Sequence, residues 1–199
     1  IGIIEHRTGE VERQLGRFQV AEERFERSIE THPSPADVYA DWALLAHRTG
    51  ETTKAGQMAD RALLAAEEEG DPLRLSRVRN ILAVVTPDPD AALDHVEEAI
   101  RLAGDDDLLR MAALNNKAHL LSESGETEEP IELVMESIAI AGRTGYRHRE
   151  AALWNHLADL HHRAGRGEDS RDSLTKAVSL FAETDAGEME PEPWLLSRW

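Results

Sequence analysis

The stretch LWNHLADLHHRAGRGEDSRDSLTKA, residues 153–177, contains the pattern that decides the fold. A small residue, Ala158, precedes a glycine, Gly165, by seven positions, and an apolar stripe of helical spacing begins five positions after the glycine. The pattern predicts two antiparallel helices, because a small side chain permits close approach and glycine readily adopts the left-handed conformation that ends a helix.

The same pattern recurs along the chain, which indicates a repeat architecture. The pairs of small residue and glycine are Gly9 and Gly16, Ala43 and Gly50, Ala118 and Gly125, and Ala158 and Gly165. The gap between the second and third pairs has room for one more unit, in which Ala83 is the small residue and Thr86 to Pro89 replace the glycine. Because one hairpin cannot bury its stripe alone, we expect about five stacked hairpins with a continuous core.

The expected helices follow from these spacings and from capping residues. They are 2–15, 18–31, 35–48, 52–68, 72–85, 89–103, 107–123, 128–142, 148–163 and 168–183, grouped into units 2–33, 34–70, 71–105, 106–145 and 146–183. Ser34, followed by Pro35, and Thr127 are predicted to cap helices with their side chains. The repeat array therefore covers residues 1–183, and residues 184–199 form a linker and a C-terminal apolar segment.

That last segment has a composition unlike the repeats. An acidic stretch with glycine and proline leads to four large apolar residues, Trp194, Leu195, Leu196 and Trp199. We expect the segment to cap the exposed face of the last hairpin, since terminal repeats need capping. The alternative is docking on another chain or domain.

Composition excludes several classes of protein. The chain has 199 residues with 39 Asp and Glu against 22 Lys and Arg, a formal net charge of -17, which disfavours nucleic acid and membrane surfaces as partners. Aromatic residues make up 5%, which argues against an all-β fold, and the absence of cysteine excludes disulfides and thiolate metal sites. We expect a cytoplasmic protein that is a monomer rather than a homodimer.

The repeated pattern resembles the tetratricopeptide repeat. The first unit matches its signature at Gly9, Gly16, Phe18, Ala21, Phe25 and Pro33. LNNKAHLL at 114–121 and LWNHLADL at 153–160 resemble the longer LNNLA-type repeats of kinesin light chains and of sensor regions in large bacterial regulators. The resemblance implies an all-α, right-handed α-solenoid whose first helices line a concave groove that binds protein or peptide.

Within that groove, asparagines recur in register. Asn80, Asn115 and Asn155 each lie three residues before the small residue of their helix. An amide offers both a donor and an acceptor, so such a ladder could pair with the main chain of an extended peptide. The other candidate peptide-binding residues are Arg48, Arg77, Asn116, His119, Asp159, His162 and Arg163. The alternative is that the asparagines satisfy polar groups between hairpins.

The sequence favours a non-catalytic interaction scaffold, the tetratricopeptide region of a larger bacterial signalling or regulatory protein. It contains no G-x-S-x-G elbow, P-loop or G-x-G-x-x-G, and no catalytic, cofactor or metal site is predicted. One alternative is a peptide-sensing switch for an attached output domain. A distant alternative is a metal-dependent enzyme that uses His156, Asp159 and His162.

Overall fold

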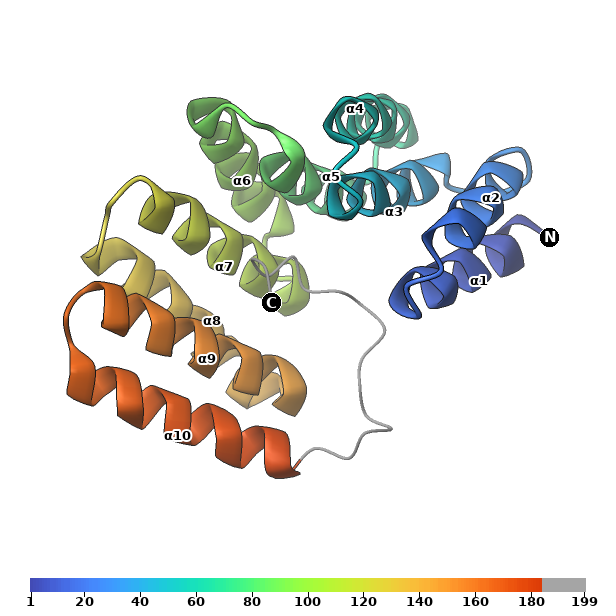
Figure 1. The fold of residues 1–199 in the computed structure, drawn as a ribbon. Helices are drawn as coiled ribbons and strands as arrows, with labels where there is room; N and C mark the ends of the chain where they lie inside the picture. Colours follow the sequence, from blue (N-terminus) through green and yellow to red (C-terminus); the bar gives the residue numbers. More distant parts are fainter. Residues whose placement is uncertain (184–199) are drawn as a thin grey trace. The chain divides into compact units, whose positions relative to one another are not determined.

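In a computed structural model, residues 1–183 are described, and they are helical throughout apart from short turns. The helices are α1 (Gly2–Gln14), α2 (Phe18–Ile29), α3 (Pro35–Arg48), α4 (Thr52–Glu69), α5 (Pro72–Val85), α6 (Pro89–Ala103), α7 (Asp107–Glu123), α8 (Glu128–Thr144), α9 (Arg147–Arg163) and α10 (Gly167–Glu183) (Figure 1). The predicted capping segment at 184–199 lies outside the described residues.

Consecutive helices pair into hairpins. Each odd-numbered helix packs on the even-numbered helix that follows it, as α9 and α10 show side by side in Figure 1. Within the unit Ile1–Ala103, α2 packs on α3 and α4 on α5; within the unit that begins at Gly104, α8 packs on α9. The prediction of an all-α fold of sequential hairpins is confirmed, and the hand of a superhelix stays a prediction.

The turns inside the hairpins form as the glycine pattern predicts. Gly50 and Gly165 have φ angles of 80° and 74°, values that residues with a Cβ atom rarely adopt. The third hairpin, which has no glycine, turns through Thr86 in an extended conformation, and Pro89 is the first residue of α6. A proline fits there because a first-turn residue needs no backbone donor.

The predicted close approach of paired helices is confirmed in the first hairpin. A Cβ added to Gly9 would lie 2.7 Å from Cε1 of Phe25, which is completely buried in α2. Alanines fill the same interface in the second hairpin, where Ala55, Ala59 and Ala62 have no exposed surface. Apolar side chains thus gather between the paired helices. Within residues 1–183, no helix combines the length and apolarity needed to cross a membrane.

Ser34 and Thr127 occupy the N-cap positions of α3 and α8 as predicted, but the predicted capping bonds from their side chains do not form. Neither side chain bonds to the first turn of its helix, and the Ser34 hydroxyl donates instead to Oε2 of Glu69 at 2.9 Å. Side-chain caps are present at Asp71, which accepts from the Leu73 amide at 3.0 Å, and at Asp106, which accepts from the Leu109 amide at 2.9 Å. The helices begin where expected because Pro35 and the apolar pattern set their starts.

Replacing Ala158 by leucine should lower the free energy of unfolding of the second unit by about 1 to 3 kcal/mol. Ala158 is 6% exposed in α9, and its carbonyl accepts a hydrogen bond from the Ser170 hydroxyl of α10 at 2.8 Å. A larger side chain would push these helices apart. Thermal unfolding checks the prediction, and an unchanged midpoint would show that the site tolerates the added volume.

Candidate functional site

The predicted site residues of the second unit lie on the first helices of its hairpins, α7 and α9. Asn115 of α7 is completely buried, and its Oδ1 accepts a hydrogen bond from Nδ1 of His156 in α9 at 2.7 Å. The Nδ2 atom of Asn115 is buried without a hydrogen-bond partner among the described residues. Asn116, beside it, is also buried. The amide of Asn115 therefore joins two hairpins.

His156 is held in its neutral form. Burial lowers the pKa of His156 to about 4, and the nearby imidazole of His119, whose ring centroid lies 6.3 Å away, adds to the effect. A neutral ring can donate from Nδ1 to the asparagine carbonyl while Nε2 carries no proton. The contact between α7 and α9 is thus a buried hydrogen bond between uncharged groups at neutral pH.

The accessible predicted residues of α9 form a stripe along one side of that helix. Asn155 is half-buried, whereas Asp159, His162 and Arg163 are exposed. Arg163 donates from Nε to Asp159 at 3.0 Å and from Nη1 to Glu123 of α7 at 2.8 Å. Because these pairs are exposed, they contribute little to stability, and a ligand could exchange them at low cost.

The predicted residues of the first unit lie in different surroundings. Asn80 of α5 is buried. Arg77, also in α5, donates from Nη2 to Asp41 at 2.8 Å and from Nη1 to Asp37 at 3.4 Å, so it ties α5 to α3. Arg48 is exposed, and its guanidinium lies 5.7 Å from the ring centroid of Phe18.

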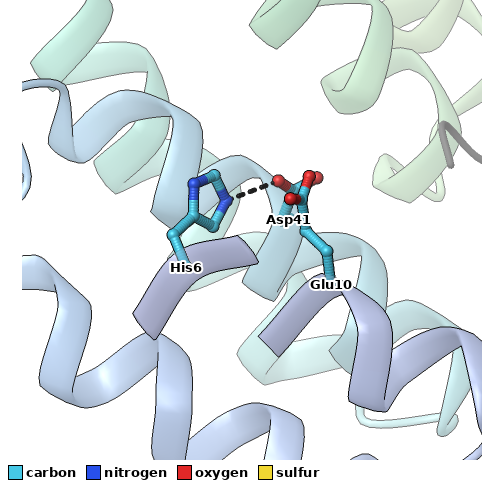
Figure 2. Close-up of side chains that lie close together, drawn as sticks. All are labelled: His6, Glu10 and Asp41. Carbon is cyan, nitrogen blue, oxygen red and sulfur yellow. Dashed lines mark hydrogen bonds and ion pairs between the residues drawn. The ribbon is translucent and has the colours of Figure 1, made fainter. Parts of the chain in front are cut away.

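Asp41 lies at the centre of a buried cluster that the sequence did not predict. Figure 2 shows the side chains of His6 and Glu10 from α1 turned toward Asp41 from α3. All three residues are buried, and Nε2 of His6 donates to Oδ2 of Asp41 at 2.7 Å. Arg13, 2% exposed, adds a buried positive charge near Asp41. The cluster links the first helices of two consecutive hairpins.

The surroundings shift the pKa values of the two carboxyl groups in this cluster in opposite directions. Burial alone would raise the pKa of Asp41, but the Arg77 guanidinium and the hydrogen bond from His6 outweigh it and hold that pKa below its usual range. Burial raises the pKa of Glu10, and the negative charge of Asp41 raises it further. Asp41 is therefore the carboxylate that stays ionised, and Glu10 is the one that accepts a proton more readily.

One imidazole and two carboxyl groups could in principle bind a divalent cation, since their nearest ligand atoms lie within 4.8 Å of one another. The surroundings oppose this. One oxygen of Asp41 accepts from His6 and the other from Arg77, so a cation would have to displace both donors beside a fixed guanidinium charge. The residues fit a structural ion-pair cluster better than a metal centre.

The alternative metal site of the fifth hairpin is not assembled. His156 is buried and bonded to Asn115, whereas Asp159 is exposed and paired with Arg163. Among residues 1–183, the group His6, Glu10 and Asp41 is the one place where three such side chains come together.

The two buried contacts occupy the same register. His6 lies three residues before Gly9, as Asn115 lies three before Ala118. Asp41 and His156 each lie two residues before the small residue of the next first helix in their unit. The sequence contains a signal for the contact between His6 and Asp41. His6 occupies in the first hairpin the position that asparagine occupies in the third, fourth and fifth.

Comparison with solved structures gives matches among tetratricopeptide proteins. A signal transduction ATPase with a tetratricopeptide repeat sensor from Pyrococcus horikoshii matches with a TM-score of 0.74 and 15% identity, over 89% of this chain and 29% of that chain. A thermophilic tetratricopeptide protein from Thermus thermophilus matches with a TM-score of 0.70 and 17% identity, over 92% of this chain and 93% of that chain.

A third match extends the comparison to kinesin light chains. The TPR-like repeats of a putative kinesin light chain from Podosopora anserina match with a TM-score of 0.66 and 17% identity, over 92% of this chain and 95% of that chain. No protein-family model matches the sequence, and no curated protein matches it. At these identities the likeness establishes the fold, and it confirms the predicted resemblance to tetratricopeptide repeats.

Proposed function

We propose that this array of tetratricopeptide-type hairpins is a non-catalytic module that binds an extended peptide or protein segment along its first helices. The observation that carries the proposal is the accessible polar stripe on α9, made of Asn155, Asp159, His162 and Arg163. These positions are spaced four, three and one residues apart, so they share one face of the helix. The stripe offers an amide, a carboxylate, an imidazole and a guanidinium to a ligand.

The buried asparagines have a different part in this proposal. Asn115 has no exposed surface and its carbonyl is already bonded, so we assign it to positioning α7 against α9. His119 of α7 is half-buried, and its ring centroid lies 6.3 Å from that of His156. An amide such as Asn155 can pair with the main chain of a peptide of any sequence, while Asp159 and Arg163 select for charge.

The test is selection of a displayed random-peptide library on the intact chain, followed by affinity measurements on variants. Replacing both Asn155 and Asp159 by alanine should weaken a selected peptide roughly 10- to 100-fold, because each lost hydrogen bond is worth about 0.5 to 1.5 kcal/mol and more when it is charged. Thermal stability should change little, since both side chains reach the surface.

The matched control places the same kinds of change on a second helix. Asp172 and Ser179 of α10 are exposed, and replacing both by alanine removes a carboxylate and a polar group away from the first helices. This control should leave the peptide affinity unchanged. Equal affinities of the Asn155 and Asp159 variant and the parent would assign binding to another surface.

A second candidate function is a peptide-sensing switch within a larger regulator. The Pyrococcus horikoshii match, in which a tetratricopeptide repeat sensor is part of a much longer ATPase, favours it. A scaffold and a sensor would use the same face, and they differ in whether binding alters an attached domain. Measuring the output activity of a natural full-length protein with and without a selected peptide distinguishes them.

A further inference from the structure

The first helix leaves one apolar side uncovered. Ile4 is 71% exposed and Val11 is 51% exposed, and their spacing of seven positions places both on the same side of α1. The opposite side of α1 packs closely on α2, where Gly9 meets the ring of Phe25. Two large aliphatic side chains two turns apart are therefore exposed to water on the side of α1 that α2 does not cover.

Equivalent residues are buried in the three later first helices that pack on a preceding second helix. Aligned on the small residue of each helix, the position of Ile4 is occupied by Val38 in α3, Val78 in α5 and Leu153 in α9, and all three are 0% exposed. The position of Val11 is occupied by Leu45, Val85 and Leu160, which are 3%, 4% and 4% exposed. The difference between α1 and these helices is thus large and systematic.

What distinguishes α3, α5 and α9 is a preceding second helix. α3 packs on α2, α5 on α4 and α9 on α8, in each case the second helix of the hairpin before it. The second helices carry buried small and branched apolar side chains, such as Ala66 of α4 and Val134 and Ile138 of α8. Because α1 has the same apolar positions, it has the surface for the same contact.

We infer that Ile4 and Val11 form a docking surface for the second helix of one further helical hairpin, which packs on α1 as α4 packs on α5. This surface belongs to α1 and uses none of the residues of the polar stripe of α9, so it adds an assembly site to the proposed peptide-binding function. The occupant follows from continuity with the three interfaces inside the chain, because the equivalent residues are buried in each first helix that packs on a preceding second helix. It is an amphipathic helix with small or branched residues along its stripe.

The experiment supplies such a hairpin in the correct register. Ile4 corresponds to Val78, so a second copy of residues 34–74 joined directly before Ile1 places α4 against α1 as it lies against α5. This extended chain should show a midpoint of thermal unfolding of the first unit raised by about 5 to 10 °C. Hydrogen exchange of peptides covering α1 should slow by more than about tenfold.

Substitutions identify the surface. Ile4→Lys with Val11→Lys should leave the midpoint of the original chain within about 2 °C, since both positions are exposed, and should abolish the gain in the extended chain. Ile3→Lys is the matched control: Ile3 is 54% exposed on the same helix, but its equivalents include the polar residues Asp37 and Arg77. In the extended chain, Ile3→Lys should leave the rise in the midpoint of thermal unfolding unchanged.

Three outcomes would overturn the inference. The extended chain could show no gain in stability or protection of α1. The double lysine variant could destabilise the original chain, which would mean that residues 184–199 or another part of the same chain already cover the surface. The original chain could also sediment as a dimer that the double lysine variant converts to a monomer, which would assign the surface to a second copy.

Discussion

Replacing Asp41 by alanine is expected to lower the free energy of unfolding of the first unit by about 3 to 5 kcal/mol. Asp41 is 1% exposed, and it accepts hydrogen bonds from His6 at 2.7 Å and from Arg77 at 2.8 Å. Without its carboxylate, the buried guanidinium of Arg13 loses its nearby negative charge and the imidazole of His6 loses its acceptor. Leaving buried polar groups unpaired costs more than the lost attraction alone.

Urea denaturation measures this effect, and hydrogen exchange of peptides from α1 and α3 locates it. Asp37→Ala is the matched control, because Asp37 also accepts from Arg77 but its side chain is 26% exposed. It should cost less than about 1 kcal/mol. Similar costs for both variants, or a loss confined to the second unit, would show that the buried cluster does not hold α1 against α3.

The hairpins could be predicted from sequence because their determinants are local. Gly165 and the stripe that follows it fix a turn and two helices within residues 153–177, and helical spacing and turn residues act over that range. The predicted bounds of α3, α5, α6 and α7 coincide with those in the structure. Other helix ends differ from the prediction by one or two residues, as at the end of α8, which extends to Thr144.

Side-chain contacts between residues far apart in the sequence could not be predicted in the same way. The His6 and Asp41 pair spans 35 residues, and the hydroxyl of Ser34 reaches Glu69 over the same separation. Whether two such side chains meet depends on the rotation and rise of each helix against the next, which no local pattern specifies. Ser34 therefore looks like a helix cap in the sequence, but its hydroxyl bonds to another helix in the fold.

The accessibility of the asparagine ladder likewise depends on how the helices pack. Its register was visible in the sequence, but the fraction of each amide that reaches solvent depends on how tightly the first helices pack. The structure buries Asn80 and Asn115 and leaves Asn155 half-buried, so residues with the same register differ in access. Register alone thus predicts which residues share a face and leaves open which of them a ligand can reach.

Lowering the pH from about 7 to about 4 is expected to destabilise the second unit through His156. In the folded chain its pKa is about 4, while in the unfolded chain it returns to the ordinary value of 6.5. Between these values the unfolded state binds a proton that the folded state excludes, so stability falls as the pH falls. Above about pH 6.5 the contribution of the neutral His156 ring to the free energy of unfolding is fully present. On reaching pH 4, the free energy of unfolding has fallen by about 3 kcal/mol through this residue.

The physical cause is the packing around the ring. His156 is 7% exposed, and a proton on Nε2 would place a positive charge in the buried contact with Asn115, next to the imidazole of His119. The amide carbonyl of Asn115 accepts from Nδ1 in either protonation state, so this hydrogen bond does not require a proton on Nε2. Solvent screening is small at this depth, which is why the effect should be large.

His156→Gln removes the titrating group while it keeps a donor that can reach Asn115. Urea denaturation at about pH 7, 6, 5 and 4 should give a parent that loses about 3 kcal/mol more than this variant over the range. His162→Gln, at an exposed position of the same helix, should follow the parent. Nuclear magnetic resonance of the His156 Cε1 proton measures the pKa directly, and a midpoint near the ordinary value would mean that water reaches the ring and that α7 and α9 are not held by a buried neutral contact.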